Sequence, residues 1–135
     1  MKRKKSALLF LSAMLILSFS CITDEDDDLV DPRDKFLGSW TVNESCSKRI
    51  YTVTITEDPS NSGNILISNF ADPGFGDPAV GIVAGTHIEL DPNEKIGDGW
   101  SVSGGGDLVK NNRMEWNYDL LIAGSEQNCS ATYTN

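Results

Sequence analysis

The chain has 135 residues, and 11 Lys and Arg against 20 Asp and Glu give it a formal charge of −9 at pH 7. Binding to nucleic acid, or direct electrostatic binding to anionic lipid, requires a basic surface, so this composition argues against both. Four of the basic residues lie within the first five positions, so a mature chain without a leader is more acidic still.

The N-terminus has the layout of a secretory signal. A basic start is followed by an apolar stretch over residues 6–19, which is short for a transmembrane helix. Cys21 comes next, directly after the small Ser20 and four residues after Leu17. This pattern resembles the lipobox of bacterial lipoproteins, which implies a lipoprotein signal peptide over residues 1–20 and a lipid on Cys21. The alternative is an ordinary secreted protein in which Cys21 is an unpaired thiol.

Five acidic residues in a row, at positions 24–28, follow the cysteine. Like charges repel one another and build no core, so we expect residues 21–33 to be a lipidated, disordered acidic tether. One interpretation is a solvated spacer. An acidic cluster behind a lipidated cysteine also resembles the signal by which Bacteroidota send lipoproteins to the outer face of the outer membrane. That resemblance implies a surface-exposed outer-membrane lipoprotein, held to the membrane by its lipid anchor.

The three cysteines are an odd number for an exported chain. A lipid on Cys21 leaves Cys46 and Cys129 as one pair, in a compartment where disulfides persist. A metal site or a redox thiol is the alternative. Two distant cysteines and one histidine are few ligands for a metal, and neither cysteine lies in a Cys-x-x-Cys motif. A structural disulfide is therefore the favoured prediction.

The rest of the chain alternates apolar and polar residues with a period of two. In residues 51–56, Tyr51, Val53 and Ile55 fall on one face and three threonines on the other, which indicates a half-buried β-strand. Residues 57–63 form a polar turn that leads into the next strand. Residues 104–106, three glycines, are expected to be a flexible hairpin turn. The eight expected strands are residues 37–44, 51–56, 64–70, 79–84, 87–90, 99–103, 113–123 and 128–134.

Short strands joined by short turns predict an all-β domain over residues 34–135. Its eight strands form an antiparallel meander, either closed into a small barrel or folded into a two-layer β-sandwich. Cys46 follows the first expected strand and Cys129 lies in the last one. In a closed meander these strands are neighbours, so a bridge between them, with Cα atoms about 4.4 to 6.8 Å apart, favours the barrel.

The segment FLGSWTV, residues 36–42, looks like the first-strand Gly-x-Trp signature of lipocalin and calycin barrels. More broadly, residues 31–135 resemble small lipocalin-like lipoproteins of Bacteroidota, through this segment, the YTVTI and ISNF strands and the late Cys-x-Ala-x-Tyr motif. The resemblance implies a lipocalin-like barrel with Gly38 and Trp40 at one end. The second and third lipocalin motifs have no counterpart here, and the domain is shorter than in typical members.

Residues that carry chemistry are few. His87 is the only histidine, and no nucleophile stands beside a base in the sequence, so we expect no catalytic residue and no enzyme. The loop carboxylates are ordinary turn formers without the EF-hand spacing, so we expect no metal site. Nothing in the sequence indicates a cofactor.

Two functions remain, and both are non-catalytic. The first is a binding module whose barrel holds a small apolar or amphipathic ligand against Trp100, Trp116 and Tyr118. The second is a structural or interaction lipoprotein with a packed barrel, whose loops contact a protein or a surface glycan. Eight strands is the size at which a barrel either fills with side chains or holds one small ligand. The Gly-x-Trp resemblance favours the binding module.

Overall fold

The computed structural model describes residues 30–135, which form one antiparallel sheet preceded by a single turn of 3-10 helix. The predicted signal peptide, Cys21 and residues 22–29 of the tether lie outside the described residues. Within the described part, no helix has the length and apolar character needed to cross a membrane. In chain order, the elements are η1 (Asp34–Phe36), β1 (Gly38–Glu44), β2 (Ile50–Glu57), β3 (Asn64–Ser68), β4 (Ala79–Ala84), β5 (His87–Leu90), β6 (Lys95–Ile96), β7 (Trp100–Lys110), β8 (Arg113–Ile122) and β9 (Ser125–Thr134).

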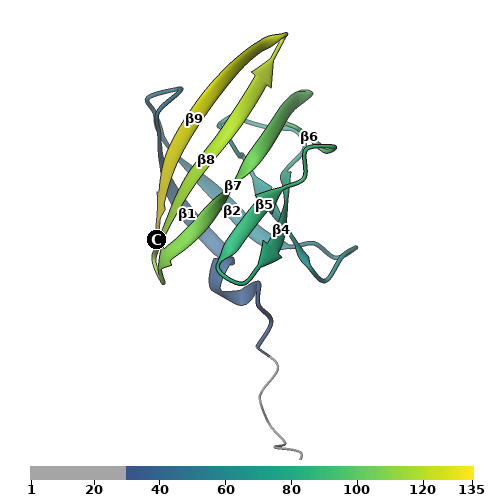
Figure 1. Ribbon diagram of the computed structural model, residues 1–135, viewed down its shortest axis with the longest axis vertical. Coiled ribbons are helices and arrows are strands. Elements are labelled where there is room, and N and C mark those ends of the chain that lie inside the picture. The colour runs from purple at the N-terminus through teal and green to yellow at the C-terminus, as the bar shows by residue number, and fades with distance from the viewer. Residues whose placement is uncertain (1–29) are drawn as a thin grey trace, which may run out of the picture.

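The sheet closes on itself to form a barrel (Figure 1). Strand β1 pairs with β2 on one side and with β9 on the other, and β5 pairs with β7. Eight antiparallel strands therefore make a continuous wall, and the two-residue β6 is an extra strand paired to the start of β7. The prediction of an all-β, lipocalin-like barrel is confirmed, and the sandwich alternative is wrong because the first and last strands are hydrogen-bonded neighbours.

The predicted glycine turn at residues 104–106 is wrong, because these glycines lie inside β7 and pair with β8. Their neighbours approach too closely for any side chain. A Cβ on Gly106 would lie 2.4 Å from the ring of Trp116, and one on Gly105 would lie 2.5 Å from the carbonyl oxygen of Ile88. Glycine in a strand often marks such a close approach. The glycines make room for a large core side chain and do not form a hairpin turn.

Aromatic side chains fill the barrel interior. The ring of Phe70 contacts Trp116 and Tyr118 edge to face, with centroid distances of 5.4 and 4.8 Å. Tyr133 lies on the other side of Trp116, with the two centroids 5.1 Å apart. These four side chains are almost completely buried. The predicted alternation holds here, since Tyr118 and Trp116 project inward from β8 with the other even-numbered residues of that strand.

The N-terminal segment packs beside the start of β1. Trp40 is fully buried, and its Nε1 donates a hydrogen bond of 2.8 Å to the carbonyl oxygen of Phe36 in η1. Gly38, with φ of +114°, opens β1 directly after η1. Gly38 and Trp40 therefore lie where the chain enters the barrel.

The folded domain begins earlier than the predicted boundary at residue 34. Arg33 is only 7% exposed, and its Nη1 donates to the carbonyl oxygen of Asn64 at 3.3 Å. Its Nε also donates to Asp31 at 3.0 Å. An arginine placed this way fixes residues 31–33 against the β2–β3 turn, so these residues belong to the domain and not to the tether.

The predicted disulfide is present. Cys46 follows β1, Cys129 lies in β9, and their Cα atoms are 5.4 Å apart. The bond spans 83 positions of the chain and joins its first and last strands next to the seam where they pair.

Candidate functional site

One end of the barrel is covered by η1; we call the opposite end the mouth. Glu44 ends β1 there, and the β1–β2 and β3–β4 loops and the β8–β9 hairpin surround it. A pocket of about 130 Å³ opens at the mouth. Its lining residues are Glu44, Cys46, Ser47, Arg49, Ala71, Asp72, Trp100, Leu120, Ile122 and Gln127.

The pocket has an apolar wall and a charged rim. Trp100 from β7 and Leu120 and Ile122 from β8 form the wall, and Trp100 and Ile122 are partly exposed. On the rim, Nη1 of Arg49 lies 3.1 Å from Oδ2 of Asp72, so an ion pair joins the β1–β2 loop to the β3–β4 loop. A molecule with both an apolar and a polar part matches this lining better than a purely apolar one.

Glu44 lies at the bottom of the pocket and is only 3% exposed. Its Oε1 accepts hydrogen bonds from the hydroxyl of Tyr51, at 3.1 Å, and from the hydroxyl of Tyr118. Its Oε2 accepts the backbone N–H of Ser47 at 3.2 Å. Among the described residues, no basic side chain forms an ion pair with this carboxylate. Polar donors alone hold a buried acid.

Three tyrosine hydroxyls surround this acid inside the barrel. Burial raises the pKa of Tyr51 and of Tyr118, and the nearby Glu44 raises both further. Burial also raises the pKa of Tyr133, whose hydroxyl has no hydrogen-bond partner within the described part of the chain. The tyrosines therefore remain neutral at physiological pH, and Tyr51 and Tyr118 act as donors to Glu44.

The three predicted ligand-lining residues occupy different depths. Trp100 lines the pocket. Tyr118 lies beneath it and reaches it through its hydrogen bond to Glu44. Trp116 lies within the aromatic core, between Phe70 and Tyr133, and is not among the lining residues. The sequence did not single out Glu44, although the alternation in β1 puts this acid on the inward face with Trp40, and that position was the available signal.

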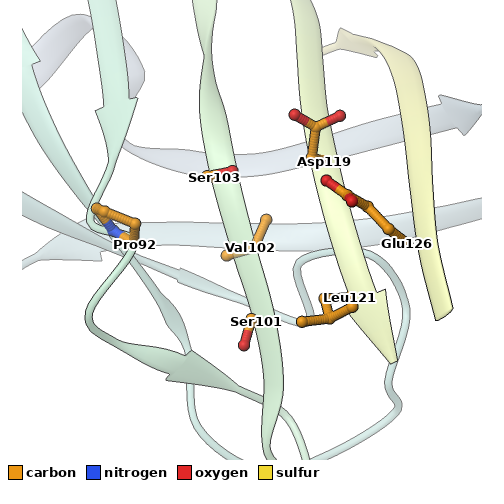
Figure 2. Close-up of a pocket in the computed structure, with 7 residues that line it drawn as sticks. All are labelled: Pro92, Ser101, Val102, Ser103, Asp119, Leu121 and Glu126. Atoms are coloured by element: carbon orange, nitrogen blue, oxygen red, sulfur yellow. The ribbon is translucent and has the colours of Figure 1, made fainter. Parts of the chain in front are cut away.

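A second hollow lies on the outer wall of the barrel, with a volume of about 210 Å³ (Figure 2). Pro92 lies on one side of β7, and the carboxylates of Asp119 and Glu126 lie on the other. This hollow is larger than the mouth pocket, but Glu126 is exposed and Asp119 already accepts a 2.8 Å hydrogen bond from Asn128. Its remaining lining residues are Ser101, Val102, Ser103 and Leu121. No buried charge lies among them, so we favour the mouth pocket as the site.

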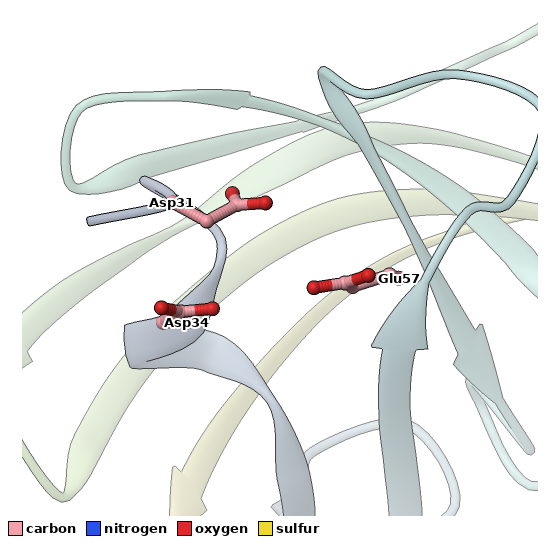
Figure 3. A group of neighbouring side chains, drawn as sticks. All are labelled: Asp31, Asp34 and Glu57. Carbon is pink, nitrogen blue, oxygen red and sulfur yellow. The ribbon is translucent and has the colours of Figure 1, made fainter. Parts of the chain in front are cut away.

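Three carboxylates gather at the η1 end, on Asp31, Asp34 and Glu57 (Figure 3). One oxygen from each can lie within 4.8 Å of the others. Arg33 already binds Asp31 and lies 3.7 Å from Glu57. The hydrogen bond from Arg33 lowers the pKa of Asp31 to about 2. The positive charge of Arg33 thus balances the three carboxylates, and we assign no metal site to them.

His87 lies on the outside of the barrel, where β5 pairs with β7. Its Nδ1 is 2.8 Å from Oδ1 of Asp107, and its Nε2 is 3.1 Å from Oε2 of Glu89. These hydrogen bonds, the one with Glu89 first, raise the pKa of His87. The histidine lines neither hollow, so it contributes to the contact between β5 and β7 and not to the mouth pocket.

No family model, curated protein or solved structure matches this chain. Inference about its function therefore starts from its own residues and their geometry. Because one fold serves many functions, the barrel alone does not define a role, and the mouth pocket carries the functional information.

Proposed function

We propose that this protein is a non-catalytic binding module that holds a small amphipathic molecule in the mouth pocket. The observation that carries the proposal is the buried carboxylate of Glu44 beneath the partly exposed Trp100. An apolar wall with one or a few fixed polar groups is the usual composition of a small-molecule site. The ligand is placed at the mouth and not deep in the barrel, because the aromatic core already occupies the interior.

We also propose that the protein is an outer-membrane lipoprotein, with a lipid on Cys21 and its folded domain on the cell surface. The lipobox-like sequence before Cys21 and the acidic positions 24–28 support this location. The cysteine of the lipoproteins that this sequence resembles carries two acyl chains, which give stable anchoring where one chain is marginal. The partner of the N-terminus is then the membrane, and the pocket is free for a ligand.

Native mass spectrometry of the protein, extracted with its anchor from its own membrane, tests the binding role. We expect a bound small molecule in the wild type that is lost from Trp100→Ala, which removes the largest side chain of the apolar wall. Leu121→Ala, in the outer-wall hollow, is the matched control and should retain the molecule. An equal bound mass in all three proteins, or none in any of them, would contradict a ligand site at the mouth.

A second candidate is an interaction lipoprotein that contacts a protein or a surface glycan through its loops. Phe75, in the β3–β4 loop, favours it, because this large apolar side chain is 81% exposed. The packed interior also suits a scaffold role. In that case Phe75→Ser would release a protein or glycan from the extracted lipoprotein, whereas Trp100→Ala would leave that partner bound.

A further inference from the structure

We infer that the mouth pocket takes a small organic cation, namely a primary alkylammonium group with a short apolar chain. This inference rests on the proposed function and names the chemical class of the ligand. It follows from the charges that line the pocket, from the free hydrogen-bonding capacity of Glu44, and from the position of the apolar wall.

Only one charge in the lining lacks an opposite partner. The lining contains three ionisable side chains, Glu44, Arg49 and Asp72. Arg49 and Asp72 are paired at 3.1 Å and balance each other. Glu44 is left as a buried acid without a cation among the described residues, and a buried charge is costly unless it is paired. A cationic ligand would supply the missing charge, while an anionic ligand would be repelled.

The carboxylate of Glu44 on the pocket floor can also accept a further hydrogen bond from a ligand. A carboxylate oxygen accepts about two hydrogen bonds. Among the donors of residues 30–135, Oε1 of Glu44 already accepts two, from Tyr51 and Tyr118, whereas Oε2 accepts only the N–H of Ser47. One acceptor position therefore remains on Oε2. An ammonium group has three donors and no acceptor, so one of its N–H groups can donate to this position, and the other two can donate to solvent at the open mouth.

The wall beside the acid is suited to the rest of such a ligand. Trp100, Leu120 and Ile122 offer apolar surface next to Glu44, where a short alkyl chain can be buried. A cation near the face of an indole is further attracted by the electrons of the ring. The volume of about 130 Å³ restricts the ligand to a few carbon atoms. The acidic domain as a whole also attracts cations.

NMR titration with n-butylammonium chloride tests the inference, with n-butanol as the uncharged probe of similar size. Both titrations are run at one ionic strength on ¹⁵N-labelled protein. The indole N–H of Trp100 and the amide N–H groups of Ser47 and Gln127 report binding. We expect these signals to shift during the titration with butylammonium. The affinity for butanol should be at least about tenfold lower, because butanol lacks the charge.

Glu44→Gln keeps the shape of the side chain and removes its charge, so we expect it to weaken butylammonium binding by at least about tenfold. Glu126→Gln, in the outer-wall hollow, is the matched control and should bind like the wild type. If Glu44→Gln does not fold, the comparison of the two probes on the wild type still tests whether the pocket prefers a cation.

Equal affinity for butylammonium and butanol would overturn the cation inference but leave a binding pocket at the mouth. Binding of neither probe would also overturn it, and the proposed function would then be judged separately by the bound mass in the native spectrum. Butylammonium binding that Glu126→Gln abolishes and Glu44→Gln does not would move the cation to the outer wall and contradict the assignment to the mouth.

Discussion

Gly106 shows how one residue without a side chain makes room for the core. Trp116 projects inward from β8 and its ring lies against the backbone of β7 at Gly106. A Cβ at that position would be 2.4 Å from the ring, well inside van der Waals contact. Crowding of this kind in a packed core typically costs about 1 to 3 kcal/mol.

Gly106→Ala should therefore lower the free energy of unfolding by about 1 to 3 kcal/mol, as measured by urea denaturation. Gly63→Ala is the control, because a Cβ there would meet only the side-chain oxygen of Asn61, at an ordinary 3.5 Å. The control should be near neutral. Equal unfolding midpoints for the two variants would contradict the account of the glycines in β7.

His87 makes the stability of the contact between β5 and β7 depend on pH. Its hydrogen bonds to Glu89 and Asp107 raise its pKa above the usual 6.5 in the folded protein. A raised pKa stabilises the fold when the imidazole is protonated. The contribution is therefore complete below about pH 6.5 and is lost as the pH rises through the higher folded pKa. The side chain is 40% exposed, so solvent screens the pair and limits the effect to less than about 1 kcal/mol.

The comparison of wild type with His87→Gln at pH 5.5 and pH 8.5 measures this contribution. We expect the wild type to be the more stable of the two at pH 5.5 and the difference to shrink at pH 8.5. Chemical denaturation gives the free energy of unfolding at each pH. A difference that is constant, or that grows with pH, would show that the carboxylates do not hold a protonated imidazole between β5 and β7.

Among the elements, the disulfide acts on the two strands that close the barrel. Cys46 and Cys129 are 83 positions apart, so the bond restricts most of the domain in the unfolded chain. Replacing both with serine should lower the free energy of unfolding by roughly 2 to 5 kcal/mol. Far-UV circular dichroism should show unchanged strand content, because the pairing of β1 with β9 holds the seam without the bond.

Non-reduced peptide mapping by mass spectrometry checks the bond itself. If the protein is exported as proposed, a peptide pair linked through Cys46 and Cys129 is expected in protein recovered from the oxidising compartment outside the cytoplasm. Two free thiols there would contradict the bridge. A double-serine variant as stable as the wild type would show that the bond contributes little to the closed barrel.

The strands with regular alternation could be predicted from the sequence, and β7 and β6 show where that signal ends. Residues 104–106 have no side chains that could alternate, and glycine is uncommon in strands, so the sequence predicts a turn. Their place in β7 depends on Trp116, which is ten positions beyond Gly106 and lies beside it only when β8 pairs with β7. Strand β6 has only two residues, too few to show a period.

The site was harder to predict than the fold, because alternation gives the face of a residue and not its depth along the barrel. Trp100 and Trp116 both project inward, yet one lines the mouth and the other lies in the core. Glu44 illustrates a second limit. Its partners Tyr51 and Tyr118 are 7 and 74 positions away, so only the closed barrel brings a carboxylate and two hydroxyls together.

At the scale of the whole molecule, the direction of the barrel relative to the proposed anchor determines whether a ligand can reach the mouth. The described chain enters the barrel beside η1, at the end opposite the mouth (Figure 1). An anchor upstream of this point would hold the η1 end toward the membrane and leave the mouth facing away from it. The proposed lipid on Cys21 is thus compatible with ligand access to the pocket.

Cys21→Ala should release the protein from the membrane. Without Cys21 the predicted acylation site is gone, and the net negative charge of the chain disfavours binding to anionic lipid. We expect the variant in the soluble fraction after cell fractionation and the wild type in the membrane fraction. Cys46→Ser with Cys129→Ser is a useful control, because it removes two other cysteines and should stay on the membrane. A Cys21→Ala protein that remains membrane-bound to the wild-type extent would contradict the anchor.

The acidic cluster at positions 24–28 should decide which side of the outer membrane the domain faces. If the cluster is an export signal, replacing all five residues with serine leaves a tether of the same length that is lipidated but no longer carried to the surface. Protease added to whole cells should then digest the wild type and spare the serine variant, while both fractionate with the membrane. A variant with five glutamates keeps the charge and should be digested like the wild type. Equal digestion of the serine variant would reduce the cluster to a solvated spacer and leave the anchor on Cys21 unaffected.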